Sequence, residues 1–323
     1  MTLKADRVHN AGKDIKKVFV VGGYIPNGGT LMAYQLGRIL HEHFGMECRI
    51  VKVGDESPAS SVFRYEKVFE SIPLAQLAES IGPQDILIAN PSFSNHLFGF
   101  RFDCVKLMYV QGYSTYTCID GGFQHYVCVS SFVRDFVRFV YGIEAPVIPA
   151  YIDGGLVPDA LAWSSRPTAD ALVWTKSFRA EFIETFQKGM QKRHPDLTYN
   201  LVEIPERLPR GRFIELMGEH RYLLTLSPVE GFGLPSLEAM SRGTTVVGFH
   251  GNGGLEYMRD GINCAVAAYP QFDAIADRFA ALLRDPRRGE QFAEQGIRDA
   301  AGFTKARFED SWVRYFRETM GLG

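Results

Sequence analysis

The sequence predicts an α/β protein of two domains, each a parallel β-sheet covered by helices, which face each other across a cleft. The length of 323 residues exceeds that of one ordinary domain. Short runs rich in Val, Ile and Leu alternate with segments of helical period, which is the rhythm of βαβ units. The rhythm restarts after the turn-rich segment Ser164–Ala171. We therefore expect an N-terminal domain over residues 1–151 and a C-terminal domain over residues 152–304.

The first domain opens with a β-branched strand at Val18–Val21, which a glycine-rich turn containing Gly28 and Gly29 joins to a helix. This helix is predicted over residues 30–45, because apolar residues recur at helical spacing and Gly45 is suited to end it. Further strands are predicted at 48–53, 85–92, 106–113 and 126–131, with a helix over 130–142.

The second domain repeats the alternation. Strands are predicted at 171–175, 197–204, 222–227, 244–249 and 263–268, and helices at 178–194, 211–220, 236–243 and 272–285. Residues 305–323 are predicted to form a terminal helix that packs back on the first domain. Its apolar face consists of Phe308, Trp312, Tyr315 and Phe316. Because arginines flank this face, a membrane-surface or partner helix is the alternative.

Composition and charge exclude several classes of function. The net charge of −2 argues against nucleic acid as a partner, because nucleic-acid binding usually requires a basic face. The five cysteines are widely spaced and form no C-x-x-C pair, which indicates neither a disulfide framework nor a zinc site. Residues 1–17 do not resemble a secretory signal, and no apolar run approaches the ~18 residues of a membrane span. We expect a cytoplasmic protein, with contact at the inner face of the membrane left open.

One stretch, "SPVEGFGLPSLEAMSRGTTVV" (Ser227–Val247), carries the chemistry. It places Glu230 and Glu238 on either side of a Gly-Phe-Gly-Leu-Pro turn, between an apolar strand and a helix. The N–H groups at such a helix start, together with the helix dipole, attract an anion such as a diphosphate. Two carboxylates beside this anion site suit the hydroxyls of sugars on either side of it. The expected ligand is therefore a nucleoside-diphosphate sugar.

The same stretch resembles the E-x7-E signature of retaining GT-B glycosyltransferases of the family-4 type. Downstream, "NGGLEYMRDGINC" is similar to a Gly-rich segment of that family, with Glu256 and Gly261 at the family spacing but Asn252 in the first glycine position. "PNGGTLMAYQLGRIL" and "VSSFVRDFVRFVYGIEAPVIPAYID" resemble its N-terminal glycine loop and its connection between domains. The resemblance implies a GT-B architecture of two Rossmann-like domains and a retaining glycosyl transfer.

The resemblance also implies roles for residues of the motif. Glu238 would bind the donor ribose, and Glu230 would contact the donor sugar near the reacting carbon. The backbone amides of Phe232, Gly233 and Leu234 would meet the sugar and the diphosphate. For Glu238, the alternative is an acid at a helix start that the helix dipole favours.

The sequence departs from the family at the cations that hold the diphosphate. The family has Gly-Arg after the first strand of the second domain and a Lys about five residues later, whereas this chain has "TKSFRAEF". Lys176 and Arg179 are the nearest cations and our candidates for the clamp, which is needed because the leaving diphosphate gains charge. The alternative is that both are solvated cations at a helix start.

The first domain offers weaker candidates. His96 follows a predicted strand and could contact the substrate, although a lone histidine is more often structural. Gly28 and Gly29 are candidate binding residues because their loop ends a strand at the expected cleft. A plain turn between strand and helix is the alternative for these glycines.

No D-x-D triplet occurs in the chain, so we expect neither a metal nor another cofactor. The predicted activity is a metal-independent transfer to a saccharide, lipid-linked or other acceptor, of the kind used in polysaccharide biosynthesis. The alternatives are a nucleotide-sugar isomerase or epimerase of the same architecture, and a non-catalytic subunit, which the missing clamp favours. A two-carboxylate hydrolase is less favoured, because these glutamates surround an anion site rather than one bond. The donor base and sugar, the acceptor and the oligomeric state are not indicated.

Overall fold

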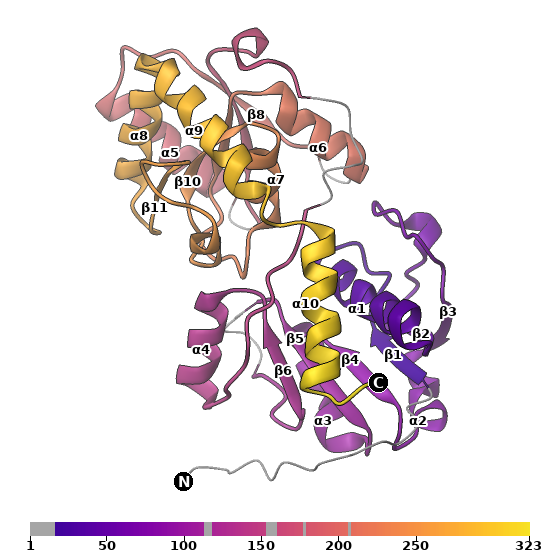
Figure 1. The fold of residues 1–323 in the computed structure, drawn as a ribbon. Coiled ribbons are helices and arrows are strands. Elements are labelled where there is room, and N and C mark those ends of the chain that lie inside the picture. Colours follow the sequence, from indigo (N-terminus) through magenta and orange to yellow (C-terminus); the bar gives the residue numbers. More distant parts are fainter. Residues whose placement is uncertain (1–16, 113–117, 153–159, 177–178, 206–207) are drawn as a thin grey trace.

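The computed structural model describes residues 17–112, 118–152, 160–176, 179–205 and 208–323, and the polar tail before residue 17 lies outside them. Figure 1 shows two α/β domains, with the last helix lying along the first of them. The strands of the first domain are β1 (Lys17–Val21), β2 (Glu47–Lys52), β3 (Glu70–Pro73), β4 (Ile86–Ala89), β5 (Val105–Val110) and β6 (His125–Cys128). Its α-helices are α1 (Gly28–Phe44), α2 (Leu77–Ser80), α3 (Phe98–Arg101) and α4 (Ser131–Tyr141).

The six strands form one parallel sheet in the order β3-β2-β1-β4-β5-β6. All four residues of β4 and the last four of β1 are buried, because helices cover both faces of such a sheet. The strand order reverses between β1 and β4, and ligands of open parallel sheets bind beyond the carboxyl ends of the strands at this switch point. The glycine-rich start of α1, which follows β1, therefore lies where a ligand is expected.

The second domain contains a second parallel sheet, in the order β11-β10-β9-β7-β8. Its strands are β7 (Asp170–Trp174), β8 (Asn200–Glu203), β9 (Tyr222–Thr225), β10 (Thr245–Phe249) and β11 (Ala265–Ala267). Its helices are α5 (Arg179–Arg193), α6 (Arg210–Glu219), α7 (Leu234–Ser241), α8 (Phe272–Arg284) and α9 (Pro286–Ala300). The two parallel sheets confirm the predicted α/β class, and the switch point of this sheet lies between β7 and β9.

Helix ends follow the residue types that suit them. Gly45 and Gly142 end α1 and α4 with φ values of 67°, the left-handed conformation that glycine adopts without a steric penalty. At the other end of α1, Asn27 Oδ1 accepts a hydrogen bond from the N–H of Thr30 at 2.9 Å. Because this cap starts α1 at Gly28, earlier than predicted, Gly28 and Gly29 belong to its first turn.

The last helix, α10 (Lys305–Glu318), packs against α1 of the first domain. Its buried residues are Phe308, Trp312, Tyr315 and Phe316. The ring of Trp312, which is 0% exposed, meets that of Tyr109 of β5 edge-on, with 5.1 Å between centroids. The aromatic face is thus occupied inside the molecule. Across the described part of the chain, no helix combines the length and the apolarity that crossing a membrane requires.

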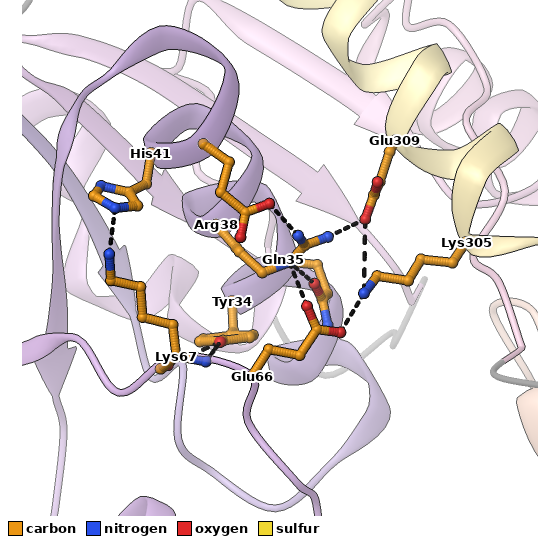
Figure 2. A network of polar contacts seen from close by, with 9 residues as sticks. Tyr34, Gln35, Arg38, His41, Glu66, Lys67, Lys305 and Glu309 are labelled. Atoms are coloured by element: carbon orange, nitrogen blue, oxygen red, sulfur yellow. Dashed lines mark hydrogen bonds and ion pairs between the residues drawn. The ribbon is translucent and has the colours of Figure 1, made fainter. Parts of the chain in front are cut away.

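Ion pairs reinforce the junction between α10 and α1 (Figure 2). The Arg38 side chain of α1, only 5% exposed, contacts Glu42, Glu66 and Glu309. Lys305 of α10 also contacts Glu66. A buried guanidinium without partners would cost several kcal/mol of desolvation, so the surrounding carboxylates are needed where Arg38 is buried. The network joins the C-terminal helix to the first domain.

Four of the strands and α-helices were not predicted from the sequence, namely β3, α2, α3 and α9. α2 and α3 have four residues each, which is too short to show a helical period. β3 is a four-residue edge strand in which only Ile72 is buried, so its sequence shows no alternation of apolar and polar residues that would predict a strand. α9 has a buried face made largely of small residues, with Phe292 as its one large apolar member. Glycine and alanine carry little hydrophobic signal, so helical periodicity is weak in such a segment.

Candidate active site

An ion pair lies at the switch point of the second sheet, where β7 and β9 end. Lys176 follows β7, Glu230 follows β9, and Lys176 Nζ contacts Glu230 Oε2. The two loops are tied further, because the N–H of Lys176 donates to Ser227 Oγ at 3.2 Å. The Lys176 side chain is 55% exposed, whereas that of Glu230 is 7% exposed. The structure thus brings one predicted clamp cation together with the first glutamate of the motif.

Glu230 is held by its backbone and by one of its two carboxylate oxygens. Its N–H donates to the carbonyl of Gly251 at 2.8 Å, and its own carbonyl accepts from the N–H of Gly253 at 3.0 Å. While Oε2 contacts Lys176, Oε1 is buried and has no hydrogen-bond partner among the described residues. Leaving a buried acceptor unsatisfied is costly, so a ligand hydroxyl would be a favourable partner for Oε1.

The glycine turn and the start of α7 form the next part of the site. Gly233 adopts a φ of 83°, and its carbonyl accepts a hydrogen bond from Tyr257 Oη. Burial, and to a smaller extent the charge of Glu230, raise the pKa of Tyr257 well above its usual value, so its hydroxyl remains a donor. Phe232 packs against the Tyr257 ring at 5.4 Å between centroids. The N–H groups of Gly233 and Leu234 have no acceptor inside the helix, an arrangement that binds anions.

Glu238, the second glutamate of the motif, is 1% exposed and is paired with Arg210, the first residue of α6. Arg210 Nη1 donates to Glu238 Oε2 at 3.2 Å, and Nη2 donates to Oε1. α7 starts at Leu234, two residues before the predicted start, so Glu238 lies beyond its first turn. The alternative of a dipole-favoured acid in the first turn therefore loses its structural basis.

The first domain reaches this site through α1 and the end of β5. A Cβ placed on Gly28 would lie 3.0 Å from Leu234 Cδ1, and one on Gly29 would lie 2.8 Å from Gln111 Oε1. A Cβ on Gly231 would lie 2.0 Å from the carbonyl oxygen of Gln111, so this approach requires glycine. Gly28 thus lies against the second domain, whereas Gly29 lies against Gln111 of its own domain, the residue that meets Gly231.

A second contact joins the motif to the start of α4. Ser130 Oγ donates to the carbonyl of Gly231 at 2.7 Å, and Glu256 Oε2 accepts from the N–H of Ser131 at 2.8 Å. Asn252, in the position of a family glycine, has a φ of 65°. Its ψ of −55° lies outside the left-handed helical region, and the N–H of Gly253 donates to the carbonyl of Gly251 at 2.9 Å, so Asn252 is the central residue of a γ-turn, a rare and strained conformation.

Two predicted catalytic residues have their contacts elsewhere. Arg179 begins α5, and its Nε donates to Glu203 Oε2 of β8 at 2.8 Å. His96 ends the short 3₁₀ helix Pro91–His96 after β4, and its ring stacks on that of Phe98 at 5.1 Å. These contacts lie within the domain of each residue, and the catalytic roles of both stay predictions.

Sequence reasoning missed Arg210 and Gln111. Arg210 resembles many other cations near helix starts, and its partner Glu238 lies 28 residues away. Gln111 follows a buried strand, and this placement at the carboxyl end of β5 was the signal available. Its Nε2 is buried and has no hydrogen-bond partner among the described residues, so it offers donors at the domain boundary.

The residues of the site suit an anion and hydroxyl groups. Within the described ranges, no group of three or more His, Cys, Asp or Glu side chains is arranged to hold a metal ion. The prediction that the reaction needs neither metal nor cofactor stays a prediction. The site provides a helix start, the two glutamates of the motif and the cations paired with them, Lys176 and Arg210.

Part of the chain matches a known family. Residues 191–299, which include both glutamates of the motif, match the model of "Glycosyl transferases group 1". A curated relative, the poly(glycerol-phosphate) alpha-glucosyltransferase of Bacillus subtilis (strain 168), is 27% identical over 91 residues. The aligned stretch covers 28% of this chain and only 14% of that relative.

Solved structures resemble nearly the whole chain. The Anabaena protein Alr3699/HepE, in complex with UDP and glucose, superposes with a TM-score of 0.71 and 12% identity, covering 95% of this chain and 99% of that one. A sucrose-phosphate synthase from Thermosynechococcus elongatus gives 0.69 and 13%, with coverages of 95% and 100%. Together with the two parallel sheets, these similarities confirm the predicted GT-B fold, and the family match supports a glycosyltransferase.

Proposed function

We propose that this protein is a retaining glycosyltransferase, which moves a sugar from a nucleoside-diphosphate sugar to a saccharide, lipid-linked or other acceptor. The observation that carries the proposal is the Lys176–Glu230 pair beside the start of α7. Oε1 of Glu230 is buried and has no partner among the residues that the structure describes. A cation and a helix start suit a diphosphate, and a carboxylate suits a sugar hydroxyl. The family match over residues 191–299 supports the same class of reaction.

In this proposal, the diphosphate departs against Lys176 and the N–H groups at the start of α7. Charge on the leaving group grows as the glycosidic bond breaks, so donors placed there stabilise the transition state more than the ground state. Glu230 Oε1 accepts a hydrogen bond from the donor sugar, and Glu238 accepts one from the ribose. Glu230 holds the ammonium group of Lys176, and Ser227 Oγ accepts from its backbone N–H, so the residue is in position before the donor binds.

Retention of configuration is proposed to follow from attack on the face that the diphosphate leaves. The acceptor oxygen bonds to the anomeric carbon as the bond to the phosphate oxygen breaks, and the acceptor proton passes to that phosphate oxygen. We propose that no metal is needed, because Lys176 and the helix start supply the compensating positive charge. A hexosyl or deoxyhexosyl group is the proposed cargo.

The acceptor is proposed to bind on the side of the first domain. Gly28 lies against Leu234 of the motif, Gly29 lies beside Gln111, and Gln111 Nε2 could donate to an acceptor hydroxyl. His96 is kept as a further candidate contact. The five cysteines are free, which suits a reducing compartment. We therefore propose a cytoplasmic enzyme of polysaccharide biosynthesis, which meets lipid-linked acceptors at the inner face of the membrane.

The deciding experiment incubates the purified protein with UDP-, dTDP- and GDP-sugars, with and without saccharide acceptors. Acceptor-dependent release of nucleoside diphosphate is the expected result, and NMR of the product's anomeric proton should show the configuration of the donor. Activity should persist in EDTA. Loss on chelation that Mn²⁺ or Mg²⁺ restores would contradict the metal-independent route.

Two other outcomes would overturn the proposed transfer. An epimerised donor would establish the isomerase alternative. Nucleotide binding without turnover, with every donor and acceptor tested, would establish the non-catalytic subunit.

A further inference from the structure

We propose that Arg210 is a positioning residue for the ribose-binding carboxylate of Glu238, and that a loop of the first domain holds Arg210 in place. The inference rests on the proposed function, because it concerns how Glu238 meets the donor. It starts from a chain of contacts that crosses the domain boundary, from Glu238 through Arg210 to the loop of residues 61–65.

The contact between Arg210 and Glu238 is a two-pronged one. Both terminal nitrogens of the guanidinium donate to the carboxylate, one to each oxygen. The two side chains are 18% and 2% exposed, so water screens the pair weakly. A planar guanidinium that holds both oxygens fixes the plane of the carboxylate, which a lysine could not do. Each oxygen can accept a second hydrogen bond, so the fixed carboxylate still has places for ribose hydroxyls.

The first domain holds Arg210 by its side chain and by its backbone. The guanidinium carbon lies 5.4 Å from the centre of the Phe63 ring, within the range of a cation–π interaction. The N–H of Arg210 donates to the carbonyl of Val62 at 3.1 Å. The loop is itself ordered by a turn in which Ser61 Oγ accepts from the N–H of Phe63 at 3.2 Å.

These contacts make the ribose site depend on both domains. Glu238 and Arg210 belong to the second domain, whereas Val62 and Phe63 lie between β2 and β3 of the first. If the loop leaves Arg210, the guanidinium loses its stacking partner and the carboxylate loses a fixed orientation. The preference of the protein for a ribose that carries its hydroxyls should then fall.

The test measures, by calorimetry, the Kd values of UDP and GDP and of their 2′,3′-dideoxy analogues. A hydrogen bond to a charged acceptor predicts that the wild type prefers the ribonucleotide by roughly 10- to 150-fold. Arg210→Ala should reduce this preference to about threefold or less, and Arg210→Lys should not restore it, because lysine offers no planar fork. Phe63→Ala should reduce the preference part of the way. Arg212→Ala, which removes a half-exposed arginine paired with Glu219 on the same helix, should leave it unchanged.

The ratio of the two Kd values separates a loss of positioning from a loss of folded protein, because unfolding would weaken the binding of both nucleotides alike. If Arg210→Ala does not fold, Phe63→Ala still tests the inference, since Arg210 and Glu238 both keep their side chains in this variant. A wild-type ratio in the Arg210 variants would overturn the positioning role, and a wild-type ratio in Phe63→Ala would overturn the role of the loop.

Glu238→Ala distinguishes a failure of this inference from a failure of the proposed function. If it alone loses the preference, only this inference fails; if it keeps the preference, or if the wild type binds none of UDP, GDP and dTDP, the proposed function fails.

Discussion

At the scale of single residues, the two glutamates of the motif differ in how they are held. One oxygen of Glu230 contacts Lys176 and the other has no partner in the described part of the chain, whereas both oxygens of Glu238 accept hydrogen bonds from Arg210. The first can accept a new hydrogen bond at an atom that otherwise stays unsatisfied. The second is fixed in orientation before any ligand arrives. We therefore expect substitutions of the two residues to produce different kinetic defects.

Glu238→Ala should raise the KM of the donor, because the ribose loses a charged acceptor, whereas Glu230→Ala should mainly lower kcat. Each lost hydrogen bond to a charged group corresponds to roughly 10- to 150-fold. Steady-state kinetics with one donor measure both parameters. Glu215→Ala, which removes a glutamate paired with Arg212 on α6, is the matched control. Wild-type constants in both motif variants would contradict the assignment.

Lys176→Ala should lower kcat by roughly 10²- to 10³-fold, because it removes a charge that compensates the leaving diphosphate. Arg179→Ala should have the smaller effect, since its guanidinium is engaged with Glu203, and Arg179→Lys should not fully rescue any loss. Single-turnover rates with a saturating donor measure the chemical step. Lys188→Ala, which removes a cation paired with Glu184 on the surface of α5, is the control. If the rates of Lys176→Ala and Arg179→Ala both stay within about threefold of the wild type, the diphosphate clamp lies elsewhere.

At the scale of elements, the sequence was most informative where one local signal decides the structure. The central strands could be predicted because buried parallel strands are short continuous apolar runs, and α1 and α4 end at glycines as expected. α9 could not be predicted, because glycine and alanine form much of its buried face. The same limit applies to the site. The motif fixes Glu230 and Glu238, whereas the Arg210 pairing depends on how α6 packs beside α7.

Removing the side chain of Trp312 should destabilise the protein by about 3–5 kcal/mol, the usual cost of truncating a buried aromatic residue. Trp312 is a fully buried residue of α10, and its ring contacts that of Tyr109 of β5. Urea denaturation of Trp312→Ala measures the free energy of unfolding, with the exposed Arg314→Ala as the control. Binding of the wild type to liposomes, together with unchanged stability of Trp312→Ala, would instead favour the membrane-surface alternative for this helix.

At the scale of the whole molecule, the two sheets are joined where each is expected to bind ligand. The start of α1 follows β1 in the first sheet, and the motif follows β9 in the second. Between them, Gly28 lies against Leu234, and Gly231 lies against Gln111. Ser130 and Glu256 add hydrogen bonds across the same boundary. The parallel direction of the strands could be expected from the βαβ rhythm, but these contacts could not, because they join loops of different domains.

Gly231→Ala tests whether this close approach is needed for turnover. The new Cβ would lie 2.0 Å from the carbonyl oxygen of Gln111, a backbone atom that cannot move aside as a side chain would. The domains must therefore shift apart, and an overpacked contact of this kind costs about 1–3 kcal/mol. We expect lower stability in urea and a fall in kcat, because the shift displaces the acceptor side of the site from Glu230. Gly121→Ala, at a glycine with no atom within 4 Å of the added Cβ, is the matched control and should retain both properties. Full activity in Gly231→Ala would mean that the reaction proceeds with the two domains further apart than in this structure, and the contacts of Gln111 with the motif would then lose their place in the mechanism.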